Sequence, residues 1–271
     1  MRSGPSSPAP AAPADAGPLT PLARQPSVQS RVASSRAVFA VATLDQPIII
    51  TIDGPAGTGK SSVARRLASR LGLDFLDTGA MYRAAASIAI DRGIDHRSDP
   101  ESLVRAVADA DLRFDWSVDP PSLLAWSIPI DHRLRDPDVT AIVSPVAGIP
   151  SLRRLMVKTQ RQIATEHRRL VTEGRDQGTV VFPDAPIKFY LDASPEVRTV
   201  RRVQQLRDAG QAPDAELVLR DIVERDRGDS SRTDGPLRCP DDAVRLDTSS
   251  ITFEQVVDEL DRMVRERLLA L

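Results

Sequence analysis

The stretch Gly54-Pro-Ala-Gly-Thr-Gly-Lys-Ser-Ser62 contains residue types that are suited to binding phosphate groups. It fits the pattern G-x-x-x-x-G-K-[ST] without a gap, in which glycines let backbone N–H groups turn toward phosphate oxygens. Lys60 supplies a mobile positive charge for the β- and γ-phosphates, and Ser61 offers a hydroxyl to Mg²⁺. An accidental lysine after a glycine-rich turn is the competing interpretation, but the chain has only three lysines. The stretch therefore predicts a nucleoside triphosphate site formed by Gly54, Pro55, Ala56, Gly57, Thr58, Gly59, Lys60, Ser61 and Ser62.

A second group of charged residues follows predicted strands or lies near the end of a predicted helix. This group consists of Arg83, Arg175, Asp176, Arg225, Asp229 and Arg232. Ligands of open α/β sheets bind at the carboxyl ends of the strands. Several arginines in such places could converge on a shared anionic ligand.

Strand and helix patterns alternate along most of the chain. Runs rich in β-branched or apolar residues predict strands over 48–52, 73–77, 169–174, 187–193 and 244–249. Apolar residues at helical spacing predict a helix from about Lys60 to Gly72, and further helices over 82–91, 151–166, 195–209, 214–227 and 252–269. This alternation predicts an α/β fold with a central, mainly parallel five-stranded sheet flanked by helices.

Residues 111–145 interrupt this alternation. Their proline-rich spacers and short apolar runs predict a small β-rich insert, in which Trp116 and Trp126 contribute packing. We expect the core domain to span residues 46–271, with this insert inside it.

Residues 1–45 differ in composition from everything that follows. They are rich in Pro, Ala and Ser and contain few large apolar side chains, so we expect a disordered leader. A non-functional extension or a start codon assigned too early is favoured over a transit peptide or a segment that tethers a partner.

The overall composition excludes several classes of protein. A net charge of −2 gives no global attraction to nucleic acid or membranes, and the best apolar run, 37–44, is far shorter than the ~20 residues of a membrane span. One cysteine, Cys239, excludes an internal disulfide and suits a reducing cytoplasm. No apolar stripe is left over for a dimer, so we expect a cytoplasmic monomer.

With these residues assembled, the chain resembles the bacterial cytidylate kinase family from about Ile48 to Leu271. The resemblance rests on "IDGPAGTGKSS", "LDTGAMYRA", "VSPVAGIPSLRR", "EGRDQGTVVFPDAPIKFYLDAS" and "RDRGDSSR". It implies a P-loop fold like that of nucleoside monophosphate kinases. It also implies transfer of the γ-phosphoryl group of ATP to CMP or dCMP, with Mg²⁺, in pyrimidine nucleotide metabolism.

The resemblance also implies roles for individual residues. The catalytic set would be Lys60, Arg83, Arg175 and Arg232, and the three arginines would hold the CMP phosphate. Ser144, Arg153 and Asp176 would bind the cytosine, while Arg225 and Asp229 would hold the sugar. The insert at 111–145 would contribute to monophosphate binding, and residues 201–213 are the expected lid.

Two other functions remain open from the residues. A kinase for UMP or AMP would share the fold but differ in base selectivity. A regulatory P-loop ATPase would hydrolyse ATP slowly, without dependence on a nucleoside monophosphate.

Overall fold

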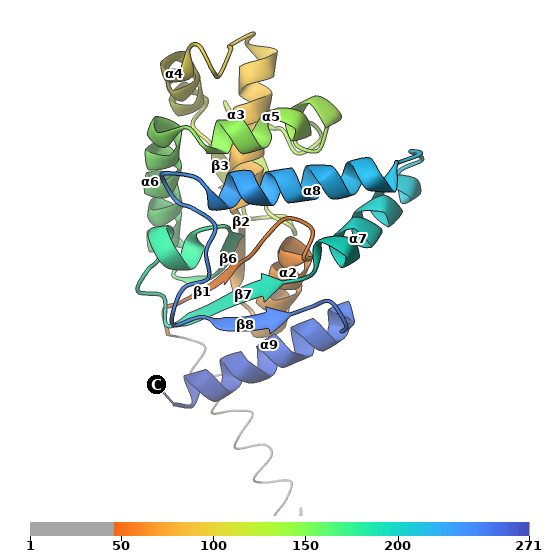
Figure 1. Cartoon of the computed structure of the whole chain (residues 1–271). Helices are drawn as coiled ribbons and strands as arrows, with labels where there is room; N and C mark the ends of the chain where they lie inside the picture. The colour runs from red at the N-terminus through yellow and green to blue at the C-terminus, as the bar shows by residue number, and fades with distance from the viewer. Residues whose placement is uncertain (1–45, 271) are drawn as a thin grey trace, which may run out of the picture. The chain divides into compact units, whose positions relative to one another are not determined.

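The computed structural model of the chain describes residues 46–270, and the leader expected at 1–45 lies outside them. Its main sheet has the strand order β2-β6-β1-β7-β8, and each neighbouring pair of strands is parallel. The strands are β1 (Ile48–Asp53), β2 (Asp74–Asp77), β6 (Arg169–Gly174), β7 (Ile187–Asp192) and β8 (Val244–Asp247). The predicted parallel five-stranded sheet is therefore confirmed (Figure 1).

Helices connect the strands and cover both faces of the sheet. They are α2 (Lys60–Leu71), α3 (Thr78–Asp91), α4 (Pro100–Ala110), α5 (Pro137–Ala147), α6 (Pro150–Glu166), α7 (Pro195–Asp208), α8 (Ala215–Ser230) and α9 (Phe253–Leu268), with a π-helix η1 (Gln177–Val181). Helix α3 begins at Thr78 rather than at the predicted Tyr82, because the Asp77 side chain caps it by accepting a hydrogen bond from the Ala80 backbone N–H.

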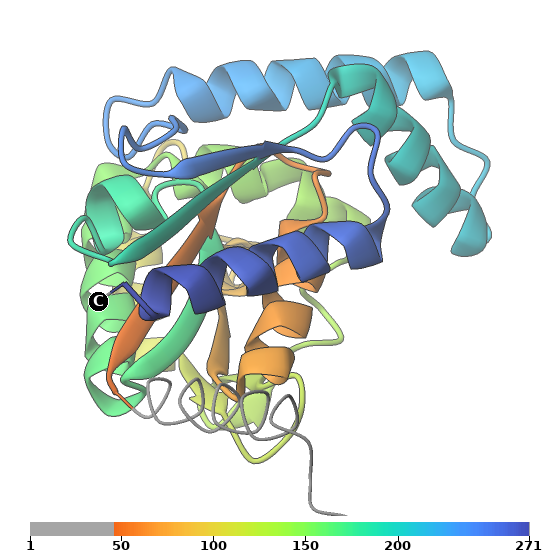
Figure 2. The same cartoon turned by 90° about the horizontal axis from the view of Figure 1, so that it is seen from below.

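The two faces of the sheet pack against different helices. Successive strand residues point to opposite faces, so Leu170 and Val171 of β6 belong to separate apolar clusters. Val171 packs in the cluster that contains α2 and α9, which lie side by side in Figure 2. Leu170 packs in the cluster that contains α3, α4, α5 and α6. Burial of both faces explains the nearly continuous apolar run of β1.

The predicted β-rich insert contains a three-stranded antiparallel sheet. Its strands are β3 (Arg113–Asp115), β4 (Ser122–Ala125) and β5 (Ile128–Pro129), in that order. The strands end well before residue 145, because helix α5 begins at Pro137. Proline suits this first helical position, where a backbone N–H would have no partner within the helix.

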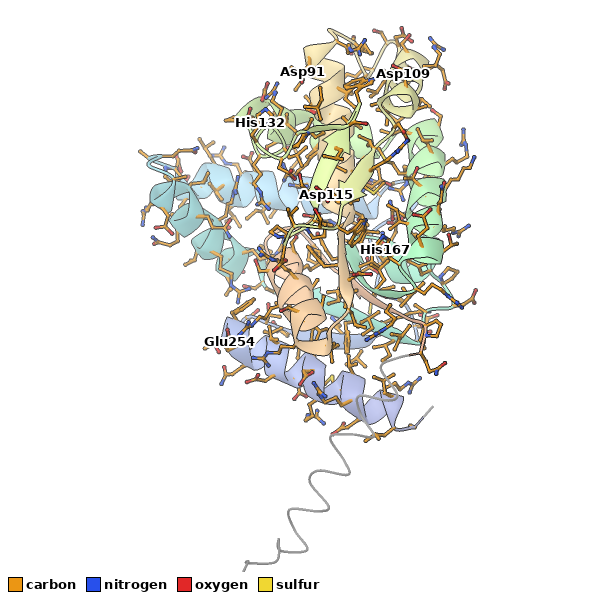
Figure 3. All side chains as sticks on the ribbon, turned by 180° about the vertical axis from the view of Figure 1, so that it is seen from behind. Asp91, Asp109, Asp115, His132, His167 and Glu254 are labelled. Atoms are coloured by element: carbon orange, nitrogen blue, oxygen red, sulfur yellow. The ribbon has the colours of Figure 1, made fainter. Side chains whose placement is uncertain are left out.

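The two tryptophans of the insert have different surroundings. The Trp116 ring stacks on His167 with the ring centroids 3.9 Å apart, and His167 Nδ1 lies 2.9 Å from Asp74 Oδ2. Figure 3 shows His167 next to the small sheet that carries Asp115. Trp126 is instead 38% exposed, with the Arg92 guanidinium 4.6 Å from its ring centroid. The packing role expected from the sequence therefore holds for Trp116 only.

None of the helices within residues 46–270 is long and apolar enough to cross a membrane.

Candidate active site

The glycine-rich loop joins the end of β1 to the start of α2. Gly54 has a φ of 147°, and a Cβ at this position would lie 2.0 Å from the Leu191 backbone oxygen. Only glycine allows the loop to pass this close to β7. Helix α2 begins at Lys60, so its free N–H groups and its dipole face the loop. The loop is therefore suited to bind phosphate groups.

Lys60 is the buried cation of this loop, with 5% of its surface exposed. Its Nζ donates a hydrogen bond to the Pro55 carbonyl oxygen at 2.7 Å. Burial, and next the positive charge of Arg175, lower the pKa of Lys60 to about 7. An anion bound at the loop would favour the charged ammonium, so the protonation of Lys60 is coupled to occupancy of the loop.

A pair of carboxylates lies beside Ser61 at the carboxyl end of the sheet. Asp77 ends β2 and pairs in register with Glu173 of β6, whose Oε1 accepts a hydrogen bond from Ser61 Oγ at 2.8 Å. Burial, and next the negative charge of Glu173, raise the pKa of Asp77 to about 7. Neither residue was assigned a role in the site from the sequence, although Asp77 ends one predicted strand and Glu173 lies next to the end of another.

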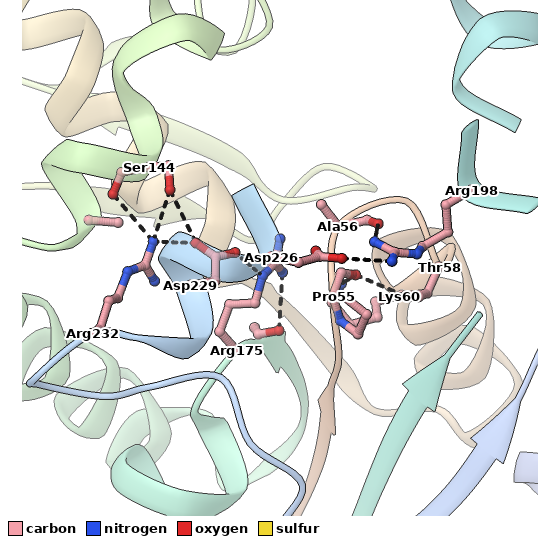
Figure 4. A network of polar contacts seen from close by, with 12 residues as sticks. Pro55, Ala56, Thr58, Lys60, Ser144, Arg175, Arg198, Asp226, Asp229 and Arg232 are labelled. Atoms are coloured by element: carbon pink, nitrogen blue, oxygen red, sulfur yellow. Dashed lines mark hydrogen bonds and ion pairs between the residues drawn. The ribbon is translucent and has the colours of Figure 1, made fainter. Parts of the chain in front are cut away.

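Residues from three distant segments meet around the carboxylate of Asp229, which is 1% exposed. Arg175, which follows β6, donates from Nε to Asp229 Oδ2 at 3.0 Å. Arg232, which follows α8, donates from Nη2 to Asp229 Oδ1 at 2.5 Å. Ser144 of α5 donates to the same oxygen at 3.1 Å, as Figure 4 shows. The predicted acceptor-site residues from these segments are thus brought together.

Two further arginines lie near this group. Arg83 of α3 donates from Nη1 to Thr140 Oγ1 at 3.0 Å, and burial, followed by the positive charge of Arg135, lowers its pKa. Burial, followed by the charge of Arg175, lowers the pKa of Arg225 to about 10. Within residues 46–270, the buried Nε of Arg225 has no hydrogen-bond partner. Arginines that repel one another in this way would be stabilised by an anion between them.

Arg153 and Asp176 form a buried ion pair between α6 and the turn after β6. Arg153 is 2% exposed, donates from Nη1 to the Ala147 carbonyl oxygen at 3.3 Å, and lies over the Tyr82 ring with its guanidinium carbon 5.8 Å from the centroid. The resemblance implied that Ser144 binds cytosine together with this pair. In the structure its hydrogen bonds join it to Asp229 and Arg232. The pair offers a carboxylate and a guanidinium to a polar ligand edge.

Asp53 fixes the turn that carries Arg175 and Asp176. It ends β1, and its two carboxylate oxygens accept hydrogen bonds from the backbone N–H groups of Gln177 at 2.9 Å and Gly178 at 2.7 Å. Burial is the first cause that raises the pKa of Asp53 to about 7. Asp53 directly precedes the glycine-rich loop, so one residue connects the loop to the turn. No feature of the sequence indicated this role for Asp53.

Arg198 is a further charged residue at the loop that sequence reasoning missed. It lies on α7, is 3% exposed, and contacts both the loop residue Ala56 and Asp226 of α8 (Figure 4). No spacing signal distinguishes it from the other arginines of α7.

Comparison with known proteins gives a consistent result. The family model described as cytidylate kinase matches residues 50–266. A cytidylate kinase of Nocardia farcinica is 44% identical over 224 residues, which cover 83% of this chain and 96% of that protein. Cytidylate kinases of Rhodococcus opacus and Corynebacterium glutamicum are each 45% identical, over 81% and 80% of this chain and 96% and 94% of their own lengths.

Proposed function

The chain belongs to the cytidylate kinase family and is a phosphotransferase for CMP and dCMP, and we propose that the residues at the carboxyl ends of its strands carry out this reaction. The observation that most supports this assignment is the group of arginines beside a glycine-rich phosphate loop. The loop would bind the triphosphate of ATP, and the arginines would bind the phosphate of the acceptor. The products are ADP and CDP or dCDP.

In this proposal, Arg83, Arg175 and Arg232 bind the acceptor phosphate. Arg175 and Arg232 share Asp229 as their counter-ion, which holds both guanidinium groups in place while leaving them further N–H groups to donate. Arg225 and Asp229 bind the sugar. The buried Nε of Arg225 has no hydrogen-bond partner among the described residues 46–270, which supports a polar ligand at this position.

Cytosine is recognised by groups that complement its polar edge. Its exocyclic amine donates hydrogen bonds and its ring N3 and O2 accept them, so Asp176 as acceptor and Arg153 as donor form a matching pair. Uracil presents an oxygen in place of the amine, so an acceptor would face the Asp176 carboxylate, whose donor would remain Arg153. Buried polar groups that stay unpaired disfavour the wrong base.

The residues near Ser61 fit a magnesium ion. Mg²⁺ prefers oxygen ligands and retains several of its waters, and Ser61, Glu173 and Asp77 supply a hydroxyl and two carboxylates at one edge of the sheet. Ser61 would be the direct ligand, and the carboxylates would accept hydrogen bonds from bound waters. When bound with ATP, Mg²⁺ neutralises charge on the phosphates.

The transfer needs no strong base, because the attacking phosphate oxygen of CMP is already ionised. This oxygen forms a bond to the γ-phosphorus of ATP while the bond from that phosphorus to the β,γ-bridging oxygen breaks. Lys60, Arg83, Arg175 and Arg232 act by positioning both nucleotides and by stabilising the charge on the transferred group. The lid predicted at residues 201–213 would exclude water that otherwise hydrolyses ATP.

The first experiment is a coupled assay of ADP formation from MgATP with CMP, dCMP, UMP or AMP as acceptor. We expect turnover with CMP and dCMP well above turnover with UMP and AMP. Faster turnover with UMP or AMP would overturn the assignment of the base-binding pair. ATP hydrolysis that no acceptor accelerates would overturn the assignment of the arginines and favour a regulatory ATPase.

A further inference from the structure

One guanidinium group connects the donor loop to the helix that carries acceptor-site residues. Arg198 donates from Nε to the Ala193 carbonyl oxygen at 2.9 Å and from Nη1 to the Ala56 carbonyl oxygen at 3.1 Å. Its Nη2 lies 2.6 Å from Asp226 Oδ2. Each nitrogen therefore contacts a different element, namely the turn after β7, the glycine-rich loop and helix α8.

The contact with the loop includes packing as well as hydrogen bonding. Gly57 has a φ of 82°, and a Cβ at this position would lie 3.3 Å from Arg198 Cβ. The base of the Arg198 side chain is thus in close contact with the loop backbone. Because Arg198 is 3% exposed, it has no freedom to leave this position without repacking of its surroundings.

The contact with α8 occurs next to acceptor-site residues. Asp226 directly follows Arg225 and lies one turn before Asp229 on α8. Its negative charge also acts on Arg175, the arginine that pairs with Asp229. Within residues 46–270, Asp226 Oδ1 is buried and has no hydrogen-bond partner. The carboxylate therefore lies between Arg198 on the donor side and Arg175 on the acceptor side.

We infer that Arg198 and Asp226 form a positioning pair that couples ATP binding at the loop to CMP binding at α8. A shift of the loop around the phosphates of ATP moves the Ala56 carbonyl, and Arg198 transmits this shift to α8 through Asp226. Neither residue touches the transferred phosphoryl group. This inference rests on the proposed function, because it assumes that the two nucleotides occupy these two sites.

Thermodynamic coupling between the sites tests the inference directly. The Kd of CMP would be measured by calorimetry with and without the magnesium complex of AMP-PNP, which is not consumed. We call the Kd of CMP without the analogue divided by the Kd with it the coupling ratio, and we expect a value of about five or more in the unsubstituted protein. In Arg198→Lys we expect the coupling ratio to fall to within about twofold of unity, because one ammonium cannot contact all three partners. The Kd of CMP alone should change little.

A second variant and a control separate coupling from general damage. Asp226→Asn keeps the shape of the side chain but removes its charge, and we expect it to lower the ratio while the loop contact of Arg198 persists. Adding Asp226→Asn to Arg198→Lys should lower the ratio no further, because both changes act on one interaction. Arg245→Lys alters an exposed ion pair with Asp192 and should leave the ratio unchanged.

The outcomes are distinguishable. If Arg198→Lys and Asp226→Asn both keep the coupling ratio of the unsubstituted protein, the inference is overturned and the proposed function stays intact. An equal weakening of CMP binding with and without the analogue would also overturn it, because that result indicates a structural role only. Failure of the unsubstituted protein to bind CMP at all would overturn the proposed function and the inference together.

Discussion

Arg175 and Asp229 are 54 residues apart in the sequence, yet Arg175 Nε donates to Asp229 Oδ2 at 3.0 Å in a part-buried ion pair. The other oxygen of the same carboxylate accepts hydrogen bonds from Arg232 and Ser144. One buried carboxylate thus balances two guanidinium groups that we assign to the acceptor phosphate. Binding of CMP would place a further negative group, its phosphate, beside the same two guanidinium groups.

This relationship predicts the effect of Asp229→Asn. The variant leaves Arg175 and Arg232 without their shared counter-charge, so we expect the free energy of unfolding to fall by about 3 kcal/mol. CMP should restore part of this loss, because its phosphate supplies a negative charge beside the same two arginines. Urea denaturation with and without CMP measures both effects.

The matched control for this prediction is Glu266→Gln, which alters an exposed ion pair with Arg262 on α9. Its effect should stay below about 1 kcal/mol, because exposed pairs contribute little. An Asp229→Asn protein as stable as its parent would contradict the counter-ion role.

The lowered pKa of Lys60 predicts that MgATP binding takes up a proton. Lys60 has a pKa of about 7 in the folded protein, so above this pH a large share of it is neutral, and the phosphates of ATP favour its charged form. Calorimetry at about pH 8, in buffers of different ionisation enthalpy, should detect net proton uptake on binding. Lys60→Arg, which stays charged, should lack this uptake, whereas Lys158→Arg on α6 should retain it.

The lowered pKa of Lys60 also determines the direction in which the free energy of unfolding changes with pH. Between pH 7 and 10.5 the unfolded chain binds more protons at Lys60 than the folded chain does, so this group makes the free energy of unfolding rise with pH. If MgATP binds to the unsubstituted protein without proton uptake, this result would contradict the role of Lys60 as a partly neutral group that becomes charged when ATP binds.

Much of the fold was predictable because single elements carry strong local signals. The β-branched run of β1 and the glycines at 54, 59 and 72 fix a strand, a loop and a helix without any reference to the rest of the chain. Helix α5 was missed as a separate element, because β-branched residues are frequent in it and Pro145 lies inside it, and both features disfavour a helix. Its packing against α3, which the sequence does not indicate, supports the helical conformation.

The site was predictable where a sequence motif determines it. Lys60 and Ser61 belong to a fixed pattern, and Arg175 and Asp176 follow a predicted strand. Arg198 could not be singled out, because α7 carries several arginines and only tertiary structure decides which one is buried against the loop. The contact from Asp53 to Gln177 likewise joins two segments whose proximity no local pattern indicates.

Base selectivity should depend on the charge of Asp176. Asp176→Asn introduces an amide that can donate to the O4 of uracil, so we expect the ratio of kcat/KM for CMP to that for UMP to fall at least about tenfold. Steady-state kinetics with both acceptors at saturating MgATP measures this ratio. Asp234→Asn also removes a carboxylate near Arg153, at 3.9 Å, but from a half-exposed position, and it should leave the ratio unchanged. Equal ratios in the two variants would contradict the role of Asp176.

The position of Arg153 depends on the absence of a side chain at residue 235. Gly235 has a φ of 61°, and a Cβ there would lie 2.0 Å from Arg153 Nη2, so Gly235→Ala must displace the guanidinium. We expect the KM for CMP to rise at least about tenfold, since the ion pair with Asp176 is disturbed, while the KM for ATP changes little. The backbone strain of alanine at positive φ, about 1 kcal/mol, also lowers stability.

Gly93→Ala separates the two effects, because Gly93 has a φ of 64° and nothing lies within 4 Å of its Cβ position. That variant should lose similar stability and keep the KM for CMP. A Gly235→Ala enzyme with an unchanged KM for CMP would show that Arg153 does not bind the base.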